Sequence, residues 1–253
     1  NSLVIIKILI LLFFVGSSIF FFKPSNFEPL LPFGLTGVLA GAATIFFAYS
    51  GFARVAVIAD EIKEPPKNVP RATILSIVIS TIIYVLVAIA AVGIAGYAVL
   101  SKSGSPLADA INLEGLNFGV TVVGVGALIA TGTVILASIL GVSRLAYTMA
   151  SNKELPELIN KLDKNGVPKN SIILSGIGML LLGLFADLPH IAYISSFSLL
   201  LYYAALNLSG LKAFKNNTRY LSLFGLLSCL ILMFSLPILS WVVGFVVLLT
   251  VIV

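Results

Sequence analysis

Apolar residues dominate this chain in long runs that short polar stretches separate. Eight runs are candidate membrane spans, and they cover residues 3–22, 35–59, 73–95, 118–147, 171–187, 191–208, 220–235 and 238–253. A membrane-spanning helix needs about 20 predominantly apolar residues, and most of these runs approach or exceed that length. The pattern predicts an all-α polytopic membrane protein that forms a single transmembrane domain.

The run at 35–59 is interrupted near its middle. Residues 35–48 are apolar, the sequence Tyr-Ser-Gly-Phe follows at 49–52, and the apolar character then resumes. Neither half reaches the length of about 20 residues that a span needs, so the two halves must form one broken span. An opened helix in lipid has to turn its freed backbone groups toward a polar cavity or a bound solute, as in transporter binding sites. The alternative is a mild kink or close packing at the glycine of an ordinary helix.

Composition and charge agree with a membrane protein. Of 253 residues, 59% are apolar and 10% are charged, whereas a soluble domain carries about 25% charged residues. The connections after the second, fourth and sixth spans hold 11 lysines and arginines, and the opposite connections hold only Lys23 and Lys102. The positive-inside rule therefore places the 11 cationic residues in the cytoplasm and predicts a multi-pass protein of the cytoplasmic membrane. These residues alternate with spans and form no continuous patch for a nucleic acid.

The sequence lacks the common motifs of enzymes. The sequence has no G-x-S-x-G, no H-E-x-x-H and no P-loop, and no carboxylate lies inside a predicted span. His190 is the only histidine and Cys229 the only cysteine, so no spacing for a metal site or an intrachain disulfide exists. We therefore expect neither catalysis nor a metal or cofactor.

Two polar features inside the apolar runs are candidates for function. Lys7 lies among isoleucines and leucines in the first run, and charges inside a membrane are functional candidates by default. The alternative to a functional role is that Lys7 extends its ammonium group to the membrane surface. The fourth run contains Thr131, Gly132 and Thr133, which either allow close helix packing or supply oxygen ligands.

Two long motifs carry a resemblance to a known family. Residues 46–72, FFAYSGFARVAVIADEIKEPPKNVPRA, resemble the sixth segment and following loop of amino acid–polyamine–organocation transporters, with F-F-A-Y-x-G-F and then E-x-x-x-P-x-x-x-P-R-A. The match allows for a doubled proline at 65–66. Residues 143–171, SRLAYTMASNKELPELINKLDKNGVPKNS, are similar to the family's S-R-x-x-Y-x-M-A … L-P … G-x-P loop. Both motifs stand in the family's order, and the lysine in the first run points to the proton-coupled branch.

The resemblance implies the leucine-transporter fold, in which two inverted five-helix repeats each begin with a broken helix. The chain would then be a fragment that corresponds to segments five to twelve of a twelve-segment transporter. Residues 3–22 would be the last helix of the first repeat, 35–208 the second repeat, and 220–253 two additional helices. The four preceding segments of the same protein would supply the other half of the substrate site.

The resemblance also implies site residues. In the family, backbone carbonyls at the break of the sixth segment hold the substrate's ammonium group, and an aromatic side chain covers it. The corresponding substrate-binding residues are Phe46, Phe47, Ala48, Tyr49, Ser50, Gly51 and Phe52. In the proton-coupled branch, a lysine at the position of Lys7 puts its ammonium where sodium-coupled relatives hold sodium. Thr133, or alternatively Thr131, would supply the hydroxyl beside that lysine.

The implied function is secondary transport of amino acids across the cytoplasmic membrane by alternating access, with proton symport. The expected partners are an amino acid, protons and the lipid bilayer. No acidic residue lies near the break, which favours a neutral substrate over a cationic one. The alternatives are an exchanger of amino acids or polyamines, and a membrane sensor that keeps the fold without transport.

Overall fold

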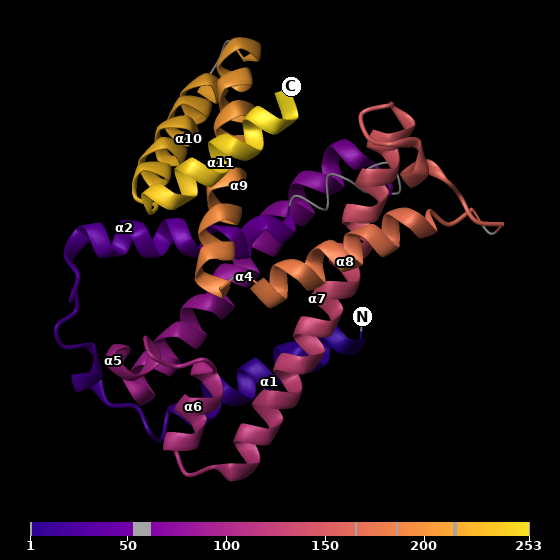
Figure 1. Ribbon diagram of the computed structural model, residues 1–253. Helices are drawn as coiled ribbons and strands as arrows, with labels where there is room; N and C mark the ends of the chain where they lie inside the picture. Colours follow the sequence, from indigo (N-terminus) through magenta and orange to yellow (C-terminus); the bar gives the residue numbers. More distant parts are fainter. Residues whose placement is uncertain (1, 53–61, 165, 186, 215–216, 253) are drawn as a thin grey trace. The chain divides into compact units, whose positions relative to one another are not determined.

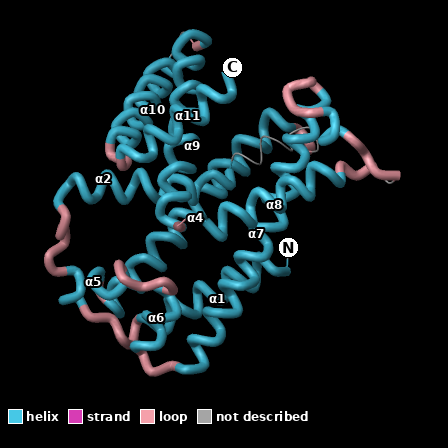
Figure 2. The backbone as a smooth tube through the Cα atoms, viewed as in Figure 1, coloured by secondary structure: helices cyan, strands magenta, loops and turns pink. Residues whose placement is uncertain are grey.

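The computed structural model describes residues 2–52, 62–164, 166–185, 187–214 and 217–252, and these form helices joined by loops, with no strand among them (Figures 1 and 2). They group into two compact units. The first unit comprises Asn1–Phe27 and Ile83–Phe185, and the second comprises Glu28–Ile82 and Ala186–Val253. The prediction of an all-α protein is confirmed.

The first unit is built around one long helix, α7, which contacts α1, α6 and α8. Its interior consists of small and branched apolar side chains that surround Phe14 of α1. The elements of this unit are α1 (Ser2–Ser18), η1 (Pro24–Phe27), the C-terminal part of α4 (Pro65–Ala95), α5 (Tyr97–Leu100), α6 (Pro106–Leu113), α7 (Asn117–Ser151), η4 (Glu157–Asn160) and α8 (Lys169–Phe185).

The second unit is built around α9, which contacts α2, η2, α10 and α11. Figure 1 shows α9 and α10 side by side, and buried residues from both helices share a core with Ala43 of α2. The elements of this unit are α2 (Gly34–Ile45), η2 (Phe46–Phe52), the N-terminal part of α4, α9 (Leu188–Ala213), α10 (Asn217–Phe234) and α11 (Ile238–Ile252).

Every predicted span overlaps a helix. Among the described residues, five helical segments are long and apolar enough to cross a membrane, and they are Gly34–Gly51, Pro65–Ala95, Asn117–Ser151, Pro189–Ala213 and Asn217–Phe234. The helices Ser2–Ser18 and Lys169–Phe185 are also apolar but have 17 residues each. A polytopic membrane protein is therefore confirmed, and the number of eight spans stays a prediction.

Several helix boundaries differ from the predicted spans, among them the start of α4 and the end of α1. Helix α4 begins at Pro65, well before residue 73, because two prolines fit the first turn of a helix, where no backbone N–H is needed. Helix α1 ends at Ser18, before residue 22. There the hydroxyl of Ser17 donates to the carbonyl of Phe14, a local bond that competes with helix continuation.

A buried carboxyl group lies in the connection between α6 and α7. Glu114 follows α6 directly and is only 6% exposed. Burial raises the pKa of this carboxyl. The ionised form of Glu114 therefore disfavours the folded state.

We expect Glu114→Gln to raise the melting temperature at about pH 8 by roughly 2–4 °C, which corresponds to about 1 kcal/mol in a chain of this size. A raised pKa means that the folded state holds the proton more tightly, so the stability of the unmodified protein decreases as the pH rises through that pKa. The difference should therefore shrink at about pH 4, where the carboxyl is protonated. The exposed Glu157 provides the control substitution Glu157→Gln. Equal melting temperatures of Glu114→Gln and the unmodified protein at the higher pH would contradict this account.

Candidate functional site

The interrupted span changes its helix type at the predicted position. Helix α2 ends at Ile45, and Phe46–Phe52 continue as a 3₁₀ helix of seven residues. Runs of this type rarely exceed 3–4 residues, so this one is unusually long. Residues 47–51 therefore depart from α-helical geometry but stay helical, and an opened break there stays a prediction. The remainder of the predicted span, 53–59, and Glu61 of the family motif lie outside the described residues.

Phe46 attaches the start of this 3₁₀ helix to α9. Its ring packs edge-on against Tyr203 of α9 with the ring centroids 5.9 Å apart, and the side chain adds to the core of the second unit. The side chain of the next residue, Phe47, is exposed. Of the predicted substrate-binding residues, Phe46 therefore has a packing role through its side chain.

Tyr49 lies in the middle of the 3₁₀ helix and is half-buried. Its hydroxyl accepts a hydrogen bond from the hydroxyl of Thr81 of α4, with the two oxygens 3.2 Å apart. Ala48 and Ser50, its neighbours in the chain, are also half-buried. The stretch 48–50 is thus partly enclosed within the second unit.

Gly51 faces open space. A Cβ atom built at this position meets no heavy atom within 4 Å among the described residues. Among the described residues, no close helix contact requires a glycine at position 51. The alternative of close packing at the Ser-Gly pair therefore has no support there.

Lys7 lies on α1 in the first unit and reaches across to α7. Its ammonium donates a hydrogen bond to the hydroxyl oxygen of Thr133 at 2.9 Å, and both residues are half-buried. The hydroxyl of Thr133 lies 2.8 Å from the carbonyl of Ala130 on its own helix. Since a hydroxyl has only one proton, Thr133 donates that proton within α7 and accepts the hydrogen bond from Lys7 with an oxygen lone pair.

Close contact between α1 and α7 brings this pair within reach. A Cβ atom at Gly126 of α7 would lie 2.9 Å from the side chain of Ile10, so only a glycine allows this approach without rearrangement. Thr131 is exposed, whereas Thr133 accepts the hydrogen bond from Lys7. Two residues apart on a helix, Thr131 and Thr133 point in directions that differ by about 200°. The structure therefore selects Thr133 from the two predicted hydroxyls.

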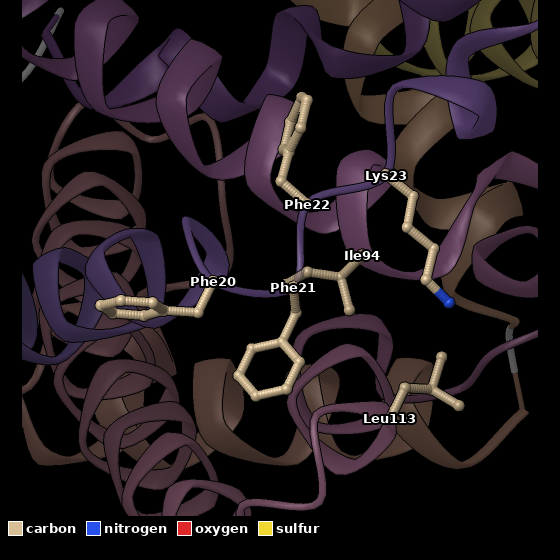
Figure 3. Close-up of a pocket in the computed structure, with 6 residues that line it drawn as sticks. All are labelled: Phe20, Phe21, Phe22, Lys23, Ile94 and Leu113. Carbon is tan, nitrogen blue, oxygen red and sulfur yellow. The ribbon is translucent and has the colours of Figure 1, made fainter.

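A pocket of about 310 Å³ lies elsewhere in the first unit. Figure 3 shows the Phe21 ring and the Lys23 side chain on the same side as Leu113, whereas Phe22 points the opposite way. The pocket includes none of the predicted site residues. Within the described ranges, no group of His, Cys, Asp or Glu side chains could hold a metal ion.

Comparison with known proteins identifies the family. The family model described as "Amino acid permease" matches residues 2–253. The chain belongs to the amino acid permease family. Within it, the chain is similar to an uncharacterized transporter of Mycobacterium tuberculosis, with 35% identity over 212 residues, which cover 82% of this chain and 48% of the relative.

Two transporters of Bacillus subtilis are also similar to this chain. The methylthioribose transporter is 34% identical over 207 residues, which cover 79% of this chain and 45% of the relative. The branched-chain amino acid permease BcaP is 31% identical over 193 residues, with 76% and 42% covered. The chain thus spans less than half the length of these relatives. Their names are those of transporters, in agreement with the prediction that the protein is not an enzyme.

We expect Gly51→Leu to fold and to weaken amino acid binding by roughly tenfold or more, or about 1.4 kcal/mol or more. The new side chain has room in the protein, and it fills the space that we assign to the solute. Gly41→Leu is the matched control, because Gly41 of α2 also faces open space but lies outside the 3₁₀ helix. Unchanged binding by Gly51→Leu, measured by isothermal titration of the full-length protein, would remove this glycine from the site.

Proposed function

We propose that the full-length protein is a secondary transporter of neutral amino acids, and that residues 1–253 supply its segments five to twelve. The observation that carries this proposal is the seven-residue 3₁₀ helix at Phe46–Phe52, which follows the apolar helix α2 and lies on the family's sixth-segment motif. Family membership and the greater length of the relatives support it. In this proposal 3–22 ends the first repeat, 35–208 forms the second, and 220–253 adds two helices.

The proposed substrate site consists of the backbone carbonyls of Phe46, Phe47, Ala48 and Ser50, with Tyr49, Gly51 and Phe52 around them. The hydrogen bonds of a 3₁₀ helix have poorer geometry than those of an α-helix, so its carbonyls are better able to accept from a solute's ammonium group. Residues 34–52 contain no aspartate or glutamate. A second positive charge on the substrate would find no carboxylate there, which favours a neutral amino acid.

The proposed coupling residue is Lys7. A protonated lysine offers three N–H donors, and a charged donor forms a stronger hydrogen bond than a neutral one. Loss of the proton would therefore weaken the 2.9 Å bond to Thr133 and the tie between α1 and α7. If the proton binds one arrangement of α1 and α7 more tightly than the other, protonation shifts the population toward that arrangement. Proton symport across the cytoplasmic membrane requires such a shift.

One relative favours a second candidate substrate. The methylthioribose transporter of Bacillus subtilis is 34% identical to this chain, and its name specifies a solute that is not an amino acid. A thio-sugar has no ammonium group, so its hydroxyl groups would have to donate to the carbonyls of the 3₁₀ helix. Methylthioribose therefore belongs among the solutes to be tested.

The test is uptake into liposomes that contain the full-length protein. Radiolabelled leucine, alanine, arginine and methylthioribose are offered separately, with and without an imposed pH gradient and with and without internal solute. Accumulation of leucine or alanine that follows the pH gradient supports the proposal. Uptake that requires internal solute indicates an exchanger, and binding without any uptake indicates a sensor; either result overturns the proposal.

Lys7→Ala should abolish accumulation driven by the pH gradient while leaving uptake down the solute's own gradient. A gradient of about one pH unit supports roughly tenfold accumulation when one proton enters per solute, because each unit is about 1.4 kcal/mol. The variant should therefore approach equal concentrations on both sides. Lys102→Ala, at an exposed lysine of the connection after α5, is the control. Equal accumulation by Lys7→Ala and the unmodified protein would show that Lys7 only extends its charge to the membrane surface.

A further inference from the structure

Two side-chain hydroxyls from neighbouring helices hold the segment that contains the 3₁₀ helix. Ser196 of α9 donates to the backbone carbonyl of Thr44, with the oxygens 3.0 Å apart. Thr81 of α4 donates to the hydroxyl of Tyr49 at 3.2 Å. All four residues belong to the second unit. One bond therefore lies just before the 3₁₀ helix and the other lies within it.

The bond from Ser196 lies where the helix type changes. The backbone pattern shifts from i→i−4 to i→i−3 bonds after Ile45, and carbonyls at such a junction lose part of their regular pairing. Ser196 is completely buried, so water cannot take its place at the carbonyl of Thr44. The hydroxyl of Thr44 is bonded to the carbonyl of Ala40 in its own helix. Ser196 is thus the side chain that meets the carbonyl of Thr44 from outside α2.

The bond from Thr81 fixes the ring of Tyr49. A tyrosine side chain has two rotatable bonds, and a partner at its hydroxyl restrains both of them together. Thr81 lies in a different helix, α4, so its hydroxyl also ties the 3₁₀ helix to α4. The position of the Tyr49 ring follows from this contact as well as from the local backbone.

We propose that Thr81 and Ser196 are positioning residues for the solute site, an inference that rests on the proposed function of the 3₁₀ helix. Ser196 sets where the 3₁₀ helix begins, and Thr81 sets the orientation of Tyr49 within it. Neither residue needs to touch the solute. Each acts through the residue to which it donates.

The same two helices offer matched controls. Ser76 of α4 donates to the carbonyl of Thr73, and Ser198 of α9 donates to the carbonyl of Ile194. Both of these bonds stay within one helix. Removing either hydroxyl should therefore leave the solute site unchanged, whereas removing the hydroxyl of Thr81 or Ser196 should not.

Uptake kinetics of the full-length protein in liposomes test the role of Thr81, with radiolabelled leucine as the solute. We expect Thr81→Val to raise the KM roughly two- to tenfold, the effect of losing one neutral hydrogen bond, with little change in the maximal rate. Thr81→Ser keeps the hydroxyl and should restore the KM, and Ser76→Ala should match the unmodified protein. Because Thr81 acts through Tyr49, Thr81→Val should add nothing in the background of Tyr49→Phe. An unchanged KM for Thr81→Val, or additive effects in the double variant, would overturn the inference.

Hydrogen–deuterium exchange tests both residues without relying on transport. We expect Ser196→Ala and Thr81→Val to speed exchange of the backbone amides of 46–52 in the full-length protein, and Ser198→Ala and Ser76→Ala to leave it unchanged. Equal exchange in all four variants would overturn the inference even if the unmodified protein transports leucine. Absence of transport by the unmodified protein would overturn the proposed function, while faster exchange would still support the two contacts.

Discussion

The structure depends on one constraint, which is that backbone polar groups inside a membrane need partners from the protein or from a solute. An α-helix satisfies its own backbone, so a change of helix type within a span requires help from neighbours. In this chain the change occurs at Phe46, and buried or half-buried hydroxyls of α9 and α4 lie next to it. In the proposed function, the solute's ammonium group would be a further partner for the carbonyls of this segment.

The contact between α1 and α7 follows from a related constraint on charge. An ammonium group is costly in lipid unless it finds an oxygen, and Thr133 supplies one at hydrogen-bond distance from Lys7. A small residue, Gly126, lets the two helices approach closely enough for this contact. Because the hydroxyl proton of Thr133 is directed at its own helix, the bond to Lys7 relies on the ammonium as the donor. The same pair thus attaches α1 to α7, and in the proposed function it is also the place where a proton would act.

The sequence predicted those features that arise from local pattern. The interruption near 49–51 was expected from the loss of apolar character. The choice between Thr131 and Thr133 needed the rotation of α7, which residue types alone do not specify. The start of α4 at Pro65 was missed, because prolines that end one helix also suit the first turn of the next. Ser196 and Thr81 could not be found from the sequence, since each contacts a residue far away in the chain and neither belongs to a motif.

The central claim is that a solute's ammonium group binds the carbonyls of the 3₁₀ helix. A structure of the full-length protein with leucine bound tests this claim most directly. The account predicts that the leucine nitrogen lies within about 3.2 Å of backbone carbonyl oxygens of Phe46–Ser50, a normal hydrogen-bond distance, and that these residues depart from α-helical geometry. Leucine bound elsewhere, or a continuous α-helix through residues 34–52, would contradict it.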